Sequence, residues 1–298
     1  MEWLGFALVA YVIWSACNLL SKILISGYVS SITVNLIGFG VWNLSPLLLL
    51  PIRGIHLPRP DLLLIAIGSG VLYFCILIPY FKALSIEEAS RVVPLWRFTP
   101  LFILLFFGSV SGEHLDAWQA SAFVLLVIGG FLVSVKRISD LFKPTKAFYL
   151  MILASFLSAT YSSIAKYLYL HLSFSDGFTL MRVSVGVCSI LMLCMPAQRQ
   201  EFCQTLRRMN GKVRGLMLLN GGLEFAGLAF YNFAMSLAPV SLVSASAGIQ
   251  AIFVLLLSIF CSLKFPQFIH EDISQRVLTQ KGVAIAMIVV GTGIISLR

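Results

Sequence analysis

Residues 80–113, YFKALSIEEASRVVPLWRFTPLFILLFFGSVSGE, decide the fold, because a weaker copy of them occupies residues 231–264. Aligned without a gap, residues 80–106 and 231–257 are identical at eight positions. In both copies a long apolar segment ends in Tyr-x-x-Ala-x-Ser, a short turn follows, and a second long apolar segment begins. About 20 apolar residues in a helix cross the hydrocarbon layer of a bilayer, so each copy predicts a hairpin of two membrane-crossing helices.

The composition places the whole chain in a membrane. Of 298 residues, 59% are hydrophobic and 11% are charged, against roughly 45–50% apolar and about 25% charged in soluble domains. The net charge of +9 does not indicate a nucleic-acid partner, because the basic residues lie in short loops between apolar spans. Such loops are typical of the positive-inside distribution of membrane proteins. The expected surroundings are therefore a lipid bilayer, and no nucleic acid.

The hydropathy pattern predicts ten spans. We expect them at about 3–25, 30–51, 61–82, 89–110, 117–136, 146–169, 174–196, 212–236, 240–263 and 280–297. Basic residues and Pro144 interrupt the apolar pattern within KRISDLFKPTK, residues 136–146. This divides the chain into a first repeat, 1–137, a connecting loop, 138–145, and a second repeat, 146–298. Because each repeat has five crossings, the second enters from the opposite face, which predicts an inverted repeat with a site near the midplane.

The first spans of the two repeats also correspond. Asn18-x-x-x-Lys22 stands 144 residues before Ser162-x-x-x-Lys166. Both lysines lie about one turn from the end of a span, where a long side chain can reach the headgroups, and snorkelling is the favoured interpretation. The alternative is that each lysine faces protein or a cavity, since the i, i+4 spacing puts it on the same helix face as a polar residue.

Three segments together resemble a known family. They are AYVIWSACNLLSK at 10–22, YFKALSIEEASRVVPLWRFTPLF at 80–102 followed by Gly112-Glu113, and YNFAMSLAPVSLVSA at 231–245. The chain resembles the drug/metabolite transporter superfamily, specifically its ten-helix EamA-type members. The resemblance implies an all-α integral membrane fold of ten transmembrane helices in two inverted five-helix repeats. It also implies transport of metabolites or drugs. Glu113 matches an acidic position common in this family, whereas the second repeat has Lys264 at the aligned position.

Three ionisable side chains fall deep inside expected spans and are candidates for function. They are Glu224, Arg97 and Arg182. A charge at mid-bilayer costs several kcal/mol unless it is paired or hydrated. Glu224 and an arginine could line a cavity and bind a zwitterion, or Glu224 could exchange a proton with the substrate. The alternative is a permanent pair of Glu224 with Arg182 or Arg97 that ties helices together.

Aromatic and amide side chains complete the candidate site. Rings can cage a cation or pack against an apolar side chain, although helix packing and an interfacial belt are the alternatives. The candidates are Trp14, Asn18, Tyr73, Trp96 and Gln250, with Tyr80, Tyr231, Lys22 and Lys166 as secondary candidates. Pro94 and Pro100 each remove a helix hydrogen bond and should bend the fourth span around Arg97.

The interpretation we favour is a secondary transporter that moves a small polar or amphipathic metabolite, amino-acid-like and exported, in a bacterial or archaeal cytoplasmic membrane. An organic-cation or drug exporter that uses Glu224 as a proton or cation site is the alternative, favoured if Glu224 is unpaired. A membrane scaffold or a lipid-modifying enzyme is the alternative from another class. Nucleotide-binding, zinc and nucleophile motifs are absent from the sequence, so we expect no enzyme activity, metal or cofactor, while proton coupling stays open.

The distribution of basic residues predicts the orientation. The loops after spans five, seven and nine carry twelve Lys and Arg residues, whereas the opposite face has Arg53, Arg59 and Arg298. The positive-inside rule then places both termini outside the cytoplasm, whereas the resemblance implies cytoplasmic termini. We expect a reporter that is active only in the cytoplasm to stay inactive when fused after Arg298. An active reporter would overturn this orientation.

Overall fold

The computed structural model describes residues 2–29, 31–49, 57–107, 118, 121–122, 124–125, 128–129, 132, 145–264 and 274–296, and the described segments are helical apart from short turns. The elements before residue 108 are α1 (Glu2–Ile23), η1 (Leu24–Tyr28), α2 (Ile32–Trp42), η2 (Ser45–Leu49), α4 (Pro60–Ile86), α5 (Ala89–Val92), η3 (Val93–Arg97), α6 (Phe98–Phe102) and η4 (Ile103–Phe107). Those after residue 144 are α9 (Lys146–His171), α10 (Phe174–Cys194), α11 (Pro196–Arg208), α12 (Gly211–Leu237), α13 (Val240–Ser246), α14 (Gly248–Lys264) and α15 (Gln275–Ser296).

The helices match the expected spans closely. Each of the nine spans that fall on described residues coincides with one helix or with consecutive helical pieces. By length and composition, α1 with η1, α4, α9 and α10 can each cross a membrane. Most of the fifth span, 117–136, lies outside the described residues, as do Glu113, Arg53, Arg298 and the connecting loop up to residue 144. The chain is thus an all-helical, multi-pass integral membrane protein.

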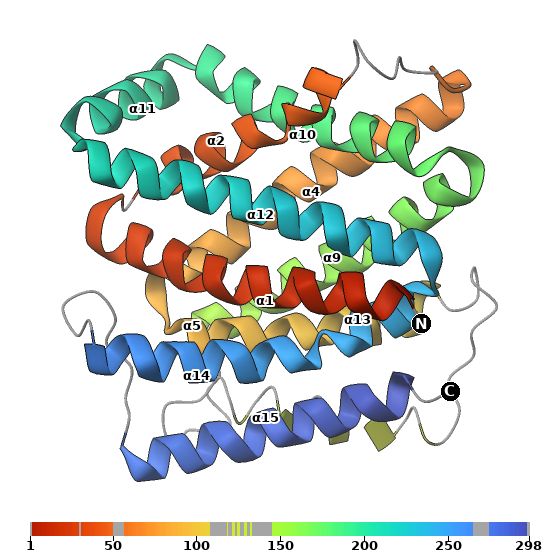
Figure 1. Cartoon of the computed structure of the whole chain (residues 1–298), viewed down its shortest axis with the longest axis vertical. Coiled ribbons are helices and arrows are strands. Elements are labelled where there is room, and N and C mark those ends of the chain that lie inside the picture. The colour runs from red at the N-terminus through yellow and green to blue at the C-terminus, as the bar shows by residue number, and fades with distance from the viewer. Residues whose placement is uncertain are drawn as a thin grey trace.

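One segment expected to be a loop is a helix. Residues 196–208 form α11, which begins at Pro196, a residue favoured in the first turn because its fixed φ suits a helix and no hydrogen bond is lost. None of its residues is buried, yet Phe202 and Leu206 pack against Met209 and Val213 of the adjoining segment. This short amphipathic helix lies at one end of the molecule, beside the start of α12 (Figure 1).

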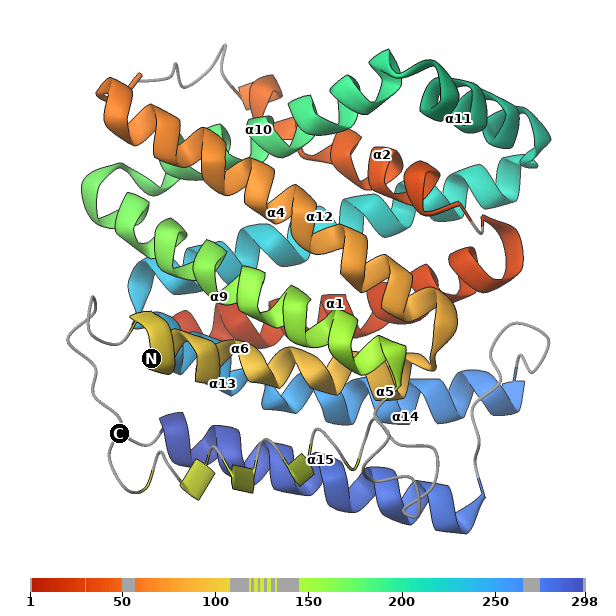
Figure 2. The same ribbon diagram turned by 180° about the vertical axis from the view of Figure 1, so that it is seen from behind.

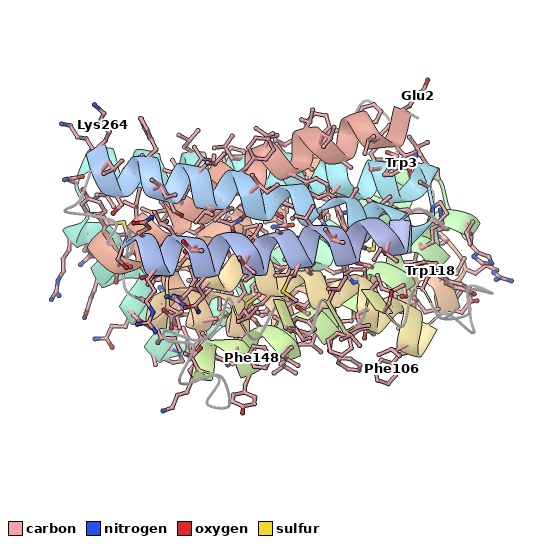
Figure 3. The ribbon with its side chains drawn as sticks, turned by 90° about the horizontal axis from the view of Figure 1, so that it is seen from below. Glu2, Trp3, Phe106, Trp118, Phe148 and Lys264 are labelled. Carbon is pink, nitrogen blue, oxygen red and sulfur yellow. The ribbon has the colours of Figure 1, made fainter. Side chains whose placement is uncertain are left out.

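Two helix pairs form the centre of the molecule. Helix α1 packs along α12, and α4 packs along α9, as Figures 1 and 2 show from opposite sides. Helix α15 lies at the outside, next to α14 (Figure 3). The helices extend between two ends of the molecule, with Lys264 at one end and Glu2 at the other (Figure 3). Large apolar side chains such as Leu64, Leu191 and Leu218 are exposed, which indicates a lipid-facing surface.

Gly38 and Gly40 of α2 allow close packing against neighbouring helices. A Cβ at Gly38 would meet Met217 Cε at 2.0 Å, and one at Gly40 would meet Ser189 Oγ at 1.5 Å. Small residues allow membrane helices to approach closely, and here they let α2 contact α12 and α10.

The fourth and ninth spans are both interrupted. In the fourth, α5 passes into the 3₁₀ segment η3 at Val93, next to Pro94, and η3 ends at Arg97. The regular helix is thus interrupted next to Pro94, at the place where the sequence predicts a bend. The ninth span breaks at a turn residue, Ala247, between α13 and α14. Interruptions leave backbone carbonyls without helical partners, and inside a bilayer water does not replace them.

Side chains from the first and sixth spans bond the carbonyls at these interruptions. Tyr11 of α1 donates to the Val243 carbonyl at 2.5 Å. Ser155 of α9, which stands 144 residues after Tyr11, donates to the Leu95 carbonyl at 3.0 Å. The two helices therefore support the two interrupted spans in the same way.

Lys22 and Lys166 make corresponding hydrogen bonds to helix ends, and this corrects the snorkelling interpretation. Lys22 Nζ donates to the carbonyls of Leu84 and Glu87 at 2.8 and 2.7 Å. Lys166 Nζ donates to those of Met235 and Ala238, each 151 residues further on, at 3.1 and 3.0 Å. Both ammonium groups thus bind the C-terminal carbonyls of a neighbouring helix, where the helix dipole favours a cation.

A buried ionic cluster joins α15 to the start of the fourth span. Lys281, whose side chain is 1% exposed, donates from Nζ to Glu88 Oε2 at 2.5 Å. Arg91 Nε lies 3.0 Å from the same carboxylate oxygen and 3.9 Å from Glu87 Oε1. At the positions aligned with Glu87, Glu88 and Arg91, the second repeat has Ala238, Pro239 and Leu242. The aligned segment of the second repeat therefore cannot form the same ionic cluster.

Replacing Lys281 with Met should destabilise the protein by about 3–5 kcal/mol, because removing one partner leaves uncompensated charge in a buried network. Arg276→Met is the matched control, since Arg276 is on the same helix and exposed, and it should change stability by no more than about 0.5 kcal/mol. Thermal melting of the purified proteins in detergent measures the difference. Equal melting temperatures for the two variants would show that the cluster does not hold α15 in place.

Candidate functional site

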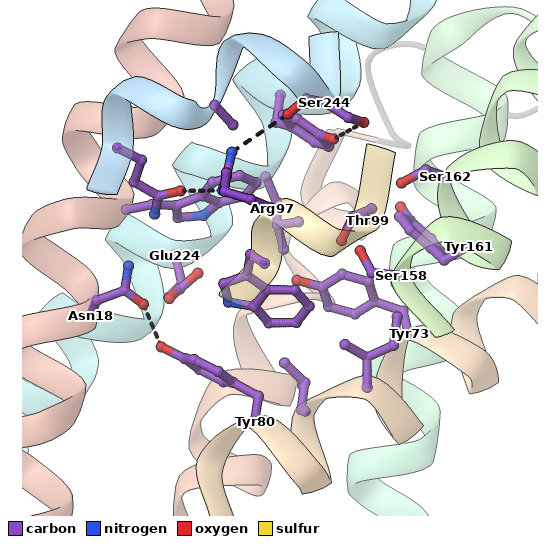
Figure 4. A pocket seen from close by; sticks show the side chains of 18 of the residues that line it. Asn18, Tyr73, Tyr80, Arg97, Thr99, Ser158, Tyr161, Ser162, Glu224 and Ser244 are labelled. Atoms are coloured by element: carbon purple, nitrogen blue, oxygen red, sulfur yellow. Dashed lines mark hydrogen bonds between the residues drawn. The ribbon is translucent and has the colours of Figure 1, made fainter. Parts of the chain in front are cut away.

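A cavity of about 120 Å³ lies in the middle of the helix bundle (Figure 4). Since a water molecule needs roughly 10–15 Å³ by this kind of measure, the space suits several waters or a small metabolite. The lining residues come from α1, α2, α4, η3, α6, α9, α12, α13 and α14, with one between α13 and α14. They are Trp14, Asn18, Phe39, Tyr73, Ile76, Leu77, Tyr80, Phe81, Trp96, Arg97, Thr99, Ser158, Tyr161, Ser162, Glu224, Leu228, Tyr231, Ser244, Ala247 and Gln250.

Most of these residues occur in pairs at the repeat spacing. Tyr73, Leu77 and Tyr80 recur 151 residues later as Glu224, Leu228 and Tyr231, and all six line the cavity. The same spacing relates Trp96 to Ala247 and Thr99 to Gln250, and a spacing of 144 relates Trp14 to Ser158 and Asn18 to Ser162. The cavity is therefore built from corresponding positions of the two copies, but only one copy supplies a carboxylate.

Glu224 is the acidic residue of the cavity. It lies near the middle of α12, and its carboxylate makes no ion pair with any residue in the described segments. The Trp14 indole lies close to it, although the indole N–H makes no bond of good geometry. The alternative of a permanent pair with Arg97 or Arg182 is therefore not seen among the described residues, and the carboxylate can receive a cationic group.

Arg97 is the basic residue of the cavity and lies at the end of η3. Its Nη2 is 3.3 Å from Gln250 Oε1, and its Nη1 is 3.5 Å from the carbonyl oxygen of Ser244. The Nε group is buried and has no acceptor in the described part of the chain. Gln250 and Ser244 flank the turn in the ninth span, so the guanidinium joins the two interrupted spans across the cavity (Figure 4).

Aromatic rings form much of the remaining wall. The ring centroids of Trp14 and Tyr231 are 5.1 Å apart, those of Tyr80 and Trp96 are 5.6 Å apart, and Tyr73 meets Tyr161 edge to face at 5.0 Å. The Tyr80 hydroxyl donates to Asn18 Oδ1 (Figure 4). Rings that are held in place by one another and by hydrogen bonds give a ligand rigid apolar faces.

Arg182 lies outside this lining. It is fully buried on α10 and donates from Nη2 to the Tyr161 hydroxyl at 2.6 Å. Its guanidinium carbon is 4.3 Å from the centre of the Tyr73 ring. Arg182, which the sequence predicts as a site residue, therefore does not line the cavity, since two tyrosines of the wall separate it from the space.

The other predicted site residues fall into two groups, those that line the cavity and those that do not. Those that line the cavity are Trp14, Asn18, Tyr73, Trp96, Arg97, Glu224 and Gln250, together with Tyr80 and Tyr231. Lys22 and Lys166 do not, because they bind helix ends. The sequence analysis did not predict Ser158, Ser162, Phe39, Tyr161 and Ser244 as lining residues. The repeat alignment could have indicated the first two serines, since they correspond to Trp14 and Asn18.

The sequence comparison identifies a family over the first part of the chain. A model of the EamA-like transporter family matches residues 1–135. These residues belong to the EamA-like transporter family. Membership implies a secondary transporter and not an enzyme, and the chain has the helical, membrane-spanning architecture that such a function requires.

Comparison with solved structures shows a similar fold over nearly the whole chain. A crystal structure described only as "Crystal structure of protein" aligns with a TM-score of 0.64, covering 99% of this chain and 96% of that one. The two sequences are 16% identical, so the match shows a shared fold alone. No curated protein matches the sequence.

Gly227→Ala should impair ligand binding through Trp14. A Cβ at Gly227 would lie 2.6 Å from Trp14 Nε1, so the indole must move from its place beside Glu224. We expect at least tenfold weaker ligand binding or transport. Gly215→Ala is the matched control on the same helix, because its Cβ would meet nothing within 4 Å. Transport by the Gly227 variant equal to that of the Gly215 variant would contradict a role for the Trp14 position.

Proposed function

We propose that this protein is a secondary transporter for a small, amphipathic, amino-acid-like zwitterion. One observation carries the proposal: Glu224 and Arg97 line the same aromatic cavity, and neither makes an ion pair with a residue in the described segments. A buried charge is costly without a partner. A ligand with both an ammonium and a carboxylate would offset both costs at once.

The environment of each charge supports this assignment. An ammonium group at Glu224 would be flanked by the rings of Trp14 and Tyr80, which favour cations. A carboxylate at Arg97 would find the Nε donor that has no acceptor in the described part of the chain. An apolar side chain would lie against Leu77, Leu228 and the aromatic wall.

The interrupted spans support alternating access. Transporters built from inverted repeats commonly bind their substrate at broken helices near the midplane. Here both interruptions lie at the cavity, and Arg97 bonds to both sides of the turn in the ninth span. We therefore propose that repeats 1–137 and 146–298 rearrange around the cavity in a bacterial or archaeal cytoplasmic membrane, with export as the direction. Glu224 is the group we assign to proton coupling.

An organic-cation exporter is the second candidate. The observation that favours it is Glu224, which lies beside aromatic rings and has no ion-pair partner among the described residues, together with an Arg97 whose Nη groups already donate to Gln250 and Ser244. Three probes separate the candidates: phenylalanine, phenethylamine and 3-phenylpropionate. Strongest stabilisation by phenylalanine in a thermal-shift assay supports the zwitterion, since binding stabilises the folded state. Strongest stabilisation by phenethylamine supports the cation exporter instead.

Glu224→Gln should leave a folded protein that no longer transports. Gln keeps the size of the side chain, but it carries no charge and releases no proton. Because Glu224 has no ionic partner in the described segments, its neutralisation should not lower the melting temperature. The measurements are thermal melting and transport of phenylalanine in proteoliposomes between about pH 5 and 8, with Arg97→Gln and Arg182→Gln as parallel variants.

The pattern of failure distinguishes the roles of the charges. Arg97→Gln should reduce transport and also stability, because it removes the bonds to the ninth span. A Glu224→Gln protein that melts like wild type and transports at the wild-type rate over the whole pH range would refute the proposed site. Wild type that transports no small amphipathic probe would refute the proposed function.

A further inference from the structure

Arg182 is a fully buried cation directly behind the cavity wall. Its exposed fraction is 0%, and its guanidinium carbon lies 4.3 Å from the ring centre of Tyr73 and 5.3 Å from that of Tyr161. Both tyrosines line the cavity, whereas Arg182 does not. The positive charge is therefore one side chain away from the space where a ligand would lie.

No carboxylate of the described segments pairs with this charge. Within the described segments, no acidic oxygen lies within 4 Å of Arg182, and its Nε and Nη1 groups have no hydrogen-bond acceptor. The guanidinium is stabilised instead by aromatic faces, including Phe178 at 5.8 Å, and by one hydrogen bond to the Tyr161 hydroxyl. A buried charge without a counter-ion projects an unscreened field into nearby low-dielectric space.

The charge is also fixed in position. The Tyr161 hydroxyl accepts from Arg182 and donates to Asn232 Oδ1 at 3.0 Å. Tyr169 donates to the same oxygen at 2.9 Å, and Asn232 Nδ2 donates to the Leu228 carbonyl at 2.9 Å. This network joins α9, α10 and α12, so the guanidinium keeps its place relative to Tyr73 and Tyr161.

The field of Arg182 and the carboxylate of Glu224 act on different parts of the cavity. Figure 4 shows Glu224 on one side of the space and Tyr161 on the other. An ammonium group is attracted at Glu224 and repelled at the Tyr73–Tyr161 wall. An aromatic wall would ordinarily favour cations, but here the guanidinium already occupies that interaction on the Tyr73 ring.

We propose that Arg182 determines the charge specificity of the cavity without contacting the ligand: it disfavours cations at the Tyr73–Tyr161 wall and directs the ammonium of a zwitterion to Glu224. The inference rests on the proposed function, since it assigns a charge preference to the same cavity. Arg182 is thus a specificity-determining residue that acts through two tyrosines.

Arg182→Met tests this, because Met fills a similar volume without charge. The probes are phenethylamine, 3-phenylpropionate and the neutral 3-phenylpropanol, titrated against purified full-length protein in detergent. Compared with wild type, the variant should bind the amine about tenfold more tightly and the acid about tenfold more weakly, as expected for one charge removed at this range. Binding of the alcohol should stay unchanged, which shows that the shape of the cavity is preserved.

Two further variants separate charge from structure. Arg182→Lys keeps a positive charge and should keep the wild-type ratio of amine to acid affinity. Phe178→Glu places a carboxylate against the guanidinium and should shift the ratio as Arg182→Met does. If Arg182→Met does not fold, the Phe178→Glu result decides.

Three outcomes are decisive. A shifted ratio with unchanged alcohol binding supports the role of Arg182. A folded Arg182→Met protein with the wild-type ratio overturns it and leaves the proposed function standing, because wild type still binds the probes. Wild type that binds none of the probes refutes the proposed function itself.

Discussion

The constraint on which this structure depends is that a backbone carbonyl inside a bilayer must find a donor within the protein. The fourth and ninth spans are interrupted at Val93–Arg97 and at Ala247, and each interruption exposes carbonyls that a regular helix would satisfy. Tyr11, Ser155 and Arg97 supply the missing donors. Because these donors come from other spans, the interruptions hold the centre of the bundle together and leave room for a cavity between them.

The two copies contribute different charged residues to the cavity. At aligned positions the first copy places Tyr73 and the second Glu224. The first copy also supplies Arg97, where the second has Gly248 at the turn that Arg97 supports. The two copies thus form a nearly symmetric cavity. The residues that differ between them, Glu224 and Arg97, give the cavity one negative and one positive group. A carboxylate and a guanidinium at different places in one cavity can orient a ligand that carries two opposite charges.

The two lysines illustrate how far local patterns predict contacts. Asn18-x-x-x-Lys22 and Ser162-x-x-x-Lys166 indicated a polar helix face, and the favoured interpretation sent the ammonium groups to the headgroups. In the structure they bind the ends of α4 and of α12. The sequence alone could not show this, because both readings place a long flexible side chain near a span end. The relative position of a neighbouring helix end decides between them.

The sequence by itself determined the membrane class, the approximate positions of the nine spans that fall on described residues, the place of the interruption next to Pro94, and nine of the twenty residues that line the cavity. These follow from local physics: apolar length sets a crossing, proline removes a helix hydrogen bond, and a polar or aromatic residue in mid-span needs a partner. Only the tertiary structure decided which charges meet. In the sequence, Arg97 and Arg182 are equally plausible partners of Glu224, since ion pairing depends on the rotation and spacing of η3, α10 and α12. That packing places Tyr73 and Tyr161 between Arg182 and the cavity and leaves Glu224 open to a ligand.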